Sequence, residues 1–134
     1  MFKTVAVSAL IATATNAGAA LSASKACVTN SGGYDLRWWY DDLNSGTESK
    51  DSGAYSAGRT RCMDMTPEII PVLAAGNFVE VIVHALVGET KSAQTPLIYD
   101  PTGPVVTFTC NGSTISFECK AAGYGDDEET YDMQ

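Results

Sequence analysis

The chain has 134 residues, with 8 Lys and Arg against 16 Asp and Glu, so its formal net charge is −8. This length accommodates one small domain, and a hydrophobic fraction of 45% excludes an intrinsically disordered chain. The acidic balance excludes a protein that binds nucleic acid non-specifically, because phosphate backbones attract basic surfaces. With a single histidine and no recognisable catalytic motif, the sequence predicts a protein that is not an enzyme and needs no cofactor or metal.

The first nineteen residues have the features of a secretory signal peptide. Lys3 is followed by an uncharged, largely apolar stretch, and Ala17-Gly18-Ala19 supplies the small residues that a signal peptidase requires. The stretch is too short for a permanent transmembrane segment, and none is expected elsewhere. We therefore predict a signal peptide over residues 1–19 and a secreted, extracellular protein, with another oxidising lumen as the alternative.

The acidic residues are concentrated near the C-terminus. Five of them lie between Asp126 and Asp132, glycines precede them, and no apolar period continues through the run. Residues 121–134 are therefore predicted to be a flexible acidic tail, and residues 20–120 the folded domain. Without the signal and the tail, 7 basic and 11 acidic residues leave a net charge of −4, which is ordinary for a soluble domain.

Apolar residues recur mostly at every second position between Cys27 and Cys119, and clusters of Gly, Asn, Asp and Pro separate the runs. This pattern is typical of short β-strands. The most apolar run, residues 78–87, is expected to be a central strand. The other expected strands cover residues 27–30, 34–41, 47–52, 60–65, 97–99, 105–110 and 113–119. Together they predict an all-β fold, a small antiparallel β-sandwich of seven or eight strands.

Four cysteines in a chain with a secretion signal predict two disulfides, and no Cys-x-x-Cys pair suggests a metal site. Asn111-Gly112 is the favoured pair for a two-residue hairpin turn, which would place Cys110 opposite Ser113. In this register Cys110 and Cys119 would lie about 20 Å apart, beyond the ~7 Å Cα separation of a disulfide. Two pairings then remain open: Cys27–Cys110 with Cys62–Cys119, or Cys27–Cys119 with Cys62–Cys110.

Two consecutive tryptophans, Trp38 and Trp39, form the densest aromatic cluster. Because neighbouring side chains on a strand point to opposite faces, Trp38 is expected in the core and Trp39 on the outside. The outward neighbours Asp35, Arg37 and Asp41 would place hydrogen-bonding groups around an exposed ring, as a sugar ligand requires. These four outward residues are the candidate ligand-binding residues. Packing of Trp39 under a loop, the tail or the second sheet is the alternative.

Two further residues are candidates for a role. Asn111 lies in the only glycosylation sequon, Asn-Gly-Ser, although a hairpin turn would also explain the asparagine. His84 is the only histidine and lies within a predicted strand, where Glu80 would be about 13 Å away. We therefore expect a hydrogen-bonded, partly buried His84 rather than a catalytic one.

These features lead to a hypothesis about function. We expect a secreted, non-enzymatic binding or structural protein whose partner is a glycan or another extracellular protein, at a cell surface or in the extracellular matrix. A place in a larger assembly is compatible with the same features. A membrane-active, cytolysin-like protein with exposed aromatic residues as its anchor is one alternative. A small hydrolase that uses His84 is the other.

Overall fold

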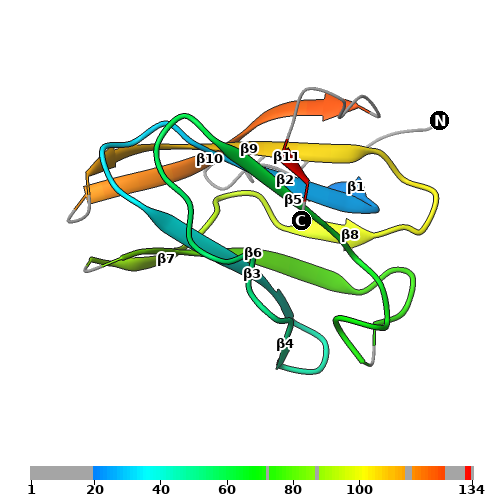
Figure 1. The fold of residues 1–134 in the computed structure, drawn as a ribbon. Coiled ribbons are helices and arrows are strands. Elements are labelled where there is room, and N and C mark those ends of the chain that lie inside the picture. The colour runs from blue at the N-terminus through cyan, green and yellow to red at the C-terminus, as the bar shows by residue number, and fades with distance from the viewer. Residues whose placement is uncertain (1–19, 72, 87, 114–115, 126–131, 134) are drawn as a thin grey trace, which may run out of the picture.

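The computed structural model describes residues 20–71, 73–86, 88–113, 116–125 and 132–133. The predicted signal peptide, residues 1–19, lies outside the described residues. Within the described ranges the chain forms two layered β-sheets and no helix, which confirms the all-β prediction (Figure 1). No helix long and apolar enough to cross a membrane occurs in these ranges.

One sheet contains six strands. They are β1 (Leu21–Ala23), β3 (Leu36–Asp42), β4 (Thr47–Glu48), β6 (Phe78–Ala85), β7 (Thr90–Ser92) and β8 (Leu97–Tyr99). Their order is β1-β8-β6-β3-β4, with β7 paired to β6. Strand β6 therefore has β3 on one side and β8 and β7 on the other, as its apolar sequence predicted.

The second sheet contains five strands, in the order β10-β9-β2-β5-β11. They are β2 (Lys25–Asn30), β5 (Thr60–Asp64), β9 (Val105–Ser113), β10 (Ser116–Gly125) and β11 (Asp132–Met133). Three pairs are parallel: β1 with β8, β2 with β9, and β5 with β11. The prediction of an antiparallel sandwich therefore holds for the other six strand pairs and is wrong for these three. Parallel neighbours need a long crossover, and between β2 and β9 the chain supplies one by building most of the other sheet.

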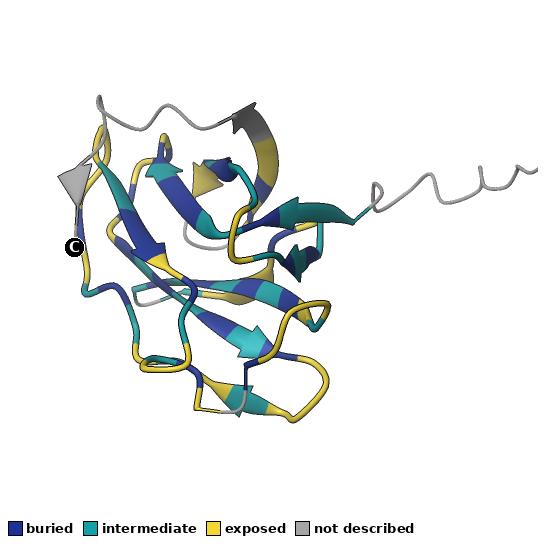
Figure 2. Cartoon of the chain, turned by 90° about the vertical axis from the view of Figure 1, so that its right-hand side faces the viewer, coloured by how far each residue is buried: buried dark blue, intermediate teal, exposed yellow. Residues whose placement is uncertain are grey.

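The hydrophobic core lies between the two sheets, and alternation is clearest on β3, β6 and β8 of the six-stranded sheet. Buried side chains alternate with more exposed ones along the strands, as Figure 2 shows in dark blue, teal and yellow. Burying each large apolar side chain contributes about 1.5–3 kcal/mol. The inward side chains of the six-stranded sheet include Leu36, Trp38 and Tyr40 on β3 and Val79, Val81, Val83 and Ala85 on β6, all fully buried.

Two tyrosines connect the sheets through buried hydroxyls. The Tyr40 hydroxyl, which comes from β3, accepts the Ala26 N–H at 2.9 Å and donates to the Met63 carbonyl. The Tyr55 hydroxyl donates to the Val28 carbonyl at 2.6 Å. Burial raises the pKa of both phenols, so the hydroxyls stay protonated and keep donating over the physiological pH range.

Both disulfides join neighbouring strands of the five-stranded sheet. Cys27–Cys62 joins β2 to β5, and Cys110–Cys119 joins β9 to β10, with a Cα–Cα distance of 4.0 Å in each. The prediction of two disulfides is confirmed, whereas both predicted pairings are wrong. The five-stranded sheet is therefore cross-linked internally, and no disulfide ties the final hairpin to an earlier strand.

The hairpin register explains this error. Asn111 and Gly112 belong to strand β9, Cys110 lies opposite Cys119, and only residues 114–115 separate the last paired residues of the two strands. The prediction of a turn at Asn111-Gly112 is therefore wrong. Gly112 has a φ of +114°, and a Cβ there would lie 2.3 Å from the carbonyl oxygen of Ser116. The glycine is required for the close approach of β10 rather than for a turn.

The C-terminal region is paired further than the predicted boundary at residue 120. Strand β10 continues to Gly125, and Asp132 and Met133 pair in parallel with Arg61 and Cys62 of β5. Residues 126–131 and 134 lie outside the described residues. The flexibility expected for the acidic run therefore stays a prediction.

Candidate functional site

Trp39 lies on the outer face of the six-stranded sheet. Along β3 the side chains of Arg37, Trp39 and Asp41 are partly exposed, whereas Trp38 between them is fully buried. The Arg37 guanidinium lies over the Trp39 ring, 5.4 Å from the guanidinium carbon to the ring centroid. An aromatic ring with a cation against it therefore lies midway along β3 on the outer face.

Asp51 fixes the position of Arg37. The Arg37 Nη1 donates to Asp51 Oδ2 at 2.6 Å, and the Gly53 N–H donates to the other carboxylate oxygen at 2.8 Å. The hydrogen bond from Gly53 and the contact with Arg37 hold the pKa of the Asp51 carboxyl below its usual range. The two side chains are 41% and 34% exposed, so the ion pair contributes only about 0–1 kcal/mol to stability. Its main effect is to hold the guanidinium against the ring.

A hollow of about 370 Å³ opens beside this group. It combines one aromatic ring with two cations, two carboxylates and a hydroxyl. The segment after β4 is anchored to β3, because the Ser49 hydroxyl accepts the Tyr40 N–H at 2.9 Å and donates to the Lys50 carbonyl at 2.7 Å. The residues that line the hollow are Arg37, Trp39, Glu48, Ser49, Lys50 and Asp51.

Two of the four predicted residues, Asp35 and Asp41, lie outside this lining. Asp35 is exposed in the segment before β3. Asp41 lies on the outer face directly opposite Glu48 and Glu80 of the neighbouring strands. Burial and the negative charges of Glu48 and Glu80 raise the pKa of the Asp41 carboxyl. Asp41 therefore belongs to a row of carboxylates, whereas Arg37 and Trp39 form the hollow.

Sequence reasoning missed the part of the hollow that comes from residues 48–51. A usable signal was present, because residues 47–52 were expected to return beside the strand that carries Trp39. An outward side chain on one strand contacts outward side chains on its neighbour. If the candidate ligand-binding residues had included the outward side chains of the expected strand 47–52, they would have included Glu48 and the segment that follows it.

His84 lies on the outer face of β6. It is partly buried, and its Nδ1 lies 2.7 Å from the Thr90 hydroxyl. Its partner in the register on β3 is Arg37, a cation. Among the described residues, no carboxylate is hydrogen-bonded to the imidazole, so a nucleophile–base–acid triad is not assembled in this part of the chain.

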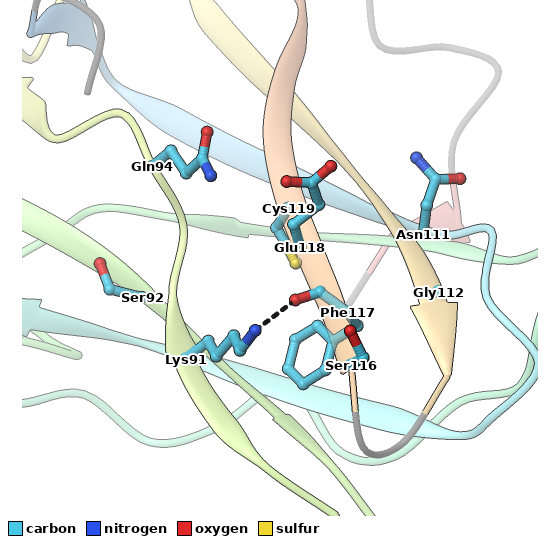
Figure 3. Close-up of a pocket in the computed structure, with 9 residues that line it drawn as sticks. All are labelled: Lys91, Ser92, Gln94, Asn111, Gly112, Ser116, Phe117, Glu118 and Cys119. Carbon is cyan, nitrogen blue, oxygen red and sulfur yellow. Dashed lines mark hydrogen bonds between the residues drawn. The ribbon is translucent and has the colours of Figure 1, made fainter. Parts of the chain in front are cut away.

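A larger cleft, of about 450 Å³, lies between β7 with the segment that follows it and the edge strand β10 (Figure 3). Lys91 Nζ donates to the Phe117 carbonyl at 2.8 Å, and the Gln94 N–H donates to the Cys119 carbonyl at 3.2 Å. These bonds occupy outward carbonyls of β10 and protect its edge from pairing with another chain. The Phe117 ring is buried and offers no stacking surface. Lys91 and the Gln94 backbone thus have a structural role at this edge.

Asn111 is exposed at the rim of the cleft. It lies on β9 opposite Glu118 of β10, within the sheet rather than in a turn. Its glycosylation stays a prediction, and its exposure is what a transferase requires.

Comparison with known proteins gives no family for this chain. No protein-family model matches it, and no curated protein matches its sequence significantly. Among the described residues, no group of three or more His, Cys, Asp or Glu side chains is arranged to hold a metal ion. The chemistry of the outer face is therefore the basis for a functional conclusion.

Proposed function

We propose that the protein is a secreted, non-enzymatic carbohydrate-binding module and that the hollow beside Trp39 is its ligand site. One observation carries the proposal: a partly exposed indole on an open sheet face borders a hollow lined by charged and hydroxyl groups. An indole presents a flat apolar surface on which the C–H face of a sugar stacks. Arginine, lysine and carboxylate groups beside the indole can form hydrogen bonds with the hydroxyls of the stacked sugar.

Preorganisation supports this role. Arg37 is held by Asp51, and the opposite wall is anchored through Ser49, so a ligand meets side chains that are already ordered. Binding to ordered groups avoids the entropy cost of immobilising long side chains. The cleft beside β10 lacks an exposed ring, and its Lys91 already binds a carbonyl. The hollow at Trp39 is therefore the better ligand site.

The proposal also places the protein outside the cell. Two disulfides support an oxidising compartment, and residues 1–19 have the composition of a signal peptide. Cleavage after Ala19 would leave the folded part intact, because β1 begins at Leu21. N-terminal sequencing of the secreted protein is expected to begin at Ala20, and retention of residues 1–19 would contradict this part of the proposal.

A glycan array tests the proposal. The secreted chain is compared with Trp39→Ala and with Phe78→Ala, a matched control because Phe78 is an exposed aromatic residue of the same sheet outside the hollow. We expect the wild type and Phe78→Ala to bind the same glycan. Loss of the stacking contact in Trp39→Ala should weaken binding roughly tenfold, which corresponds to about 1.4 kcal/mol.

Two results would contradict the proposal. One is an array on which the wild-type protein binds no glycan, and the other is equal binding by Trp39→Ala. Thermal unfolding of each variant checks that a loss of binding is not a loss of folding. If the wild type cleaves the bound glycan and His84→Ala does not, the hydrolase alternative replaces this proposal.

A further inference from the structure

Two exposed apolar side chains lie next to each other at one end of the six-stranded sheet. Leu43 is 48% exposed and Phe78 is 45% exposed, and both are large hydrophobic residues. The Leu43 N–H donates to the Phe78 carbonyl at 2.9 Å, which joins the turn after β3 to the start of β6. Phe78 lies opposite Ile98 of β8, which is partly exposed. We refer to Leu43, Phe78 and Ile98 as the apolar end.

A buried carboxylate holds the apolar end in place. Asp42 is fully buried and accepts hydrogen bonds from the Asn44 N–H at 3.0 Å, the Ser45 hydroxyl at 3.1 Å and the Asn77 amide at 3.2 Å. The Asn44 side-chain oxygen in turn accepts the Phe78 N–H at 2.8 Å. The exposure of these apolar side chains is therefore fixed by hydrogen bonds of the fold. Leu43, Phe78 and Ile98 therefore present one fixed apolar surface at this end of the sheet.

The charged groups around the apolar end are acidic. Asp41 lies opposite both Glu48 and Glu80, so three carboxylates form a row across β4, β3 and β6 beside the apolar side chains. Asp100 follows directly after β8. The raised pKa of Asp41 reflects, after burial, the repulsion from its acidic neighbours, which a cation placed among them would relieve.

The basic groups of this sheet lie elsewhere. Arg37 is at the other end of β3 and is bound to Asp51. His84 is at the other end of β6, beside Thr90. Lys50 lies beyond β4 and lines the hollow at Trp39 together with Glu48. Asp41 and Glu80, which lie outside the hollow, therefore keep the surroundings of the apolar end negative.

We infer that the apolar end and the carboxylates Asp41, Glu48 and Glu80 dock a partner protein through a segment that carries both apolar and basic side chains. Apolar side chains of such a segment would cover Leu43 and Phe78, and its lysines or arginines would pair with the carboxylates. A second copy of this chain would bring the same negative charge and be repelled. An anionic lipid surface would be repelled too, and a zwitterionic one gains nothing from the carboxylates.

Fluorescence anisotropy with a synthetic peptide of alternating leucine and lysine tests the inference on the secreted chain. The double variant Leu43→Ser/Phe78→Ser is expected to raise the dissociation constant about tenfold or more, and Glu80→Gln by a smaller factor. Leu86→Ser is the matched apolar control, because Leu86 lies just beyond the other end of β6. Glu118→Gln is the matched charge control on the other sheet.

Three outcomes would overturn the inference: no binding of the peptide to the wild type, equal binding by the double variant, or equal losses in the two controls. Binding to phosphatidylcholine vesicles that the double variant abolishes would also overturn it, because it would assign the apolar end to a lipid surface, as the cytolysin-like alternative requires. Unfolding temperatures of all variants check folding. The double variant is expected to keep glycan binding, and Trp39→Ala to keep peptide binding, so each proposal can fail alone.

Discussion

The two sheets of the sandwich are stabilised differently. All four cysteines lie in the five-stranded sheet, where they cross-link β2 to β5 and β9 to β10. The six-stranded sheet has no cross-link and is held by its hydrogen-bonded ladders and by buried side chains such as Trp38 and Tyr40. Its outer face carries Trp39, the hollow and the apolar end. We propose that one sheet serves as a covalent scaffold and that the other presents the binding surface.

The strongest test of this difference between core and binding surface is to truncate the two neighbouring tryptophans, one on each face of β3. Trp38 is fully buried between the sheets, so Trp38→Ala should lower the free energy of unfolding by about 3–5 kcal/mol. Trp39 lies on the outer face and is only partly buried, so Trp39→Ala should lower it by only about 1 kcal/mol. Urea unfolding of both variants measures the difference. Comparable losses would show that Trp39 is a structural residue.

The disulfides should differ in their effect on stability. Cys27–Cys62 closes a longer loop than Cys110–Cys119, with sequence separations of 35 and 9 residues. In the chain-entropy model, replacing both cysteines by alanine should then cost about 4 kcal/mol for the first disulfide and about 3 kcal/mol for the second. Urea unfolding of the two double variants tests the order. The reverse order would mean that the hairpin, rather than the β2–β5 pair, is the critical part of the scaffold.

The hydroxyl of Tyr40 is the next most sensitive link, because it joins the two sheets. Tyr40→Phe leaves the Ala26 N–H and the Met63 carbonyl buried without their partner, at a cost of about 2–3 kcal/mol. Tyr55→Phe removes the bond to the Val28 carbonyl and should cost about 1–2 kcal/mol. The urea midpoints of both variants measure this. Equal midpoints for Tyr40→Phe and the wild type would show that the sheets do not depend on this link.

The smallest effects concern two aspartates with opposite pKa shifts. Asp51 has a lowered pKa, so its ionisation stabilises the fold above the unfolded value of 3.8, and this stabilisation is lost as pH falls through the lower folded pKa. Asp41 has a raised pKa, so its ionisation destabilises the fold at neutral pH, and the penalty disappears as pH falls towards 3.8.

These shifts predict opposite changes in the unfolding temperature. At neutral pH, Asp51→Asn should lower the Tm and Asp41→Asn should raise it, and both differences should vanish in acid below the respective pKa values. Thermal unfolding, followed by circular dichroism from neutral pH down to acid, is the measurement. The same sign for both variants at neutral pH would contradict the assignment of Asp41 to a repulsive carboxylate row.

Local patterns in the sequence predicted local structure well. Alternation on β6 predicted a central strand with Val79, Val81 and Val83 on its buried face, and the same principle separated Trp38 from Trp39. Long-range arrangement was not accessible in this way. The parallel pairing of β2 with β9 depends on how the whole intervening chain crosses between sheets, which no short pattern records.

The wrong cysteine pairing followed from one local assumption, the position of the hairpin turn. Asn111-Gly112 has the composition of a tight turn, and the predicted register followed from placing the turn there. In the structure Gly112 serves the close approach of two strands, the connection falls at residues 114–115, and Cys110 comes to lie opposite Cys119. The sequence predicted that Arg37 and Trp39 share the outer face of one strand, whereas Ser49 and Asp51, which also line the hollow, were not among the predicted site residues.

The most direct test of the central claim is a hydrogen–deuterium exchange map of the secreted protein with and without the glycan that it binds most strongly on the array. Binding at Trp39 predicts slower exchange in β3 and in residues 48–51, with no change in β9 and β10. Failure of the protein to bind any glycan would contradict the claim. So would protection confined to β9 and β10, because the cross-linked sheet would then carry the ligand.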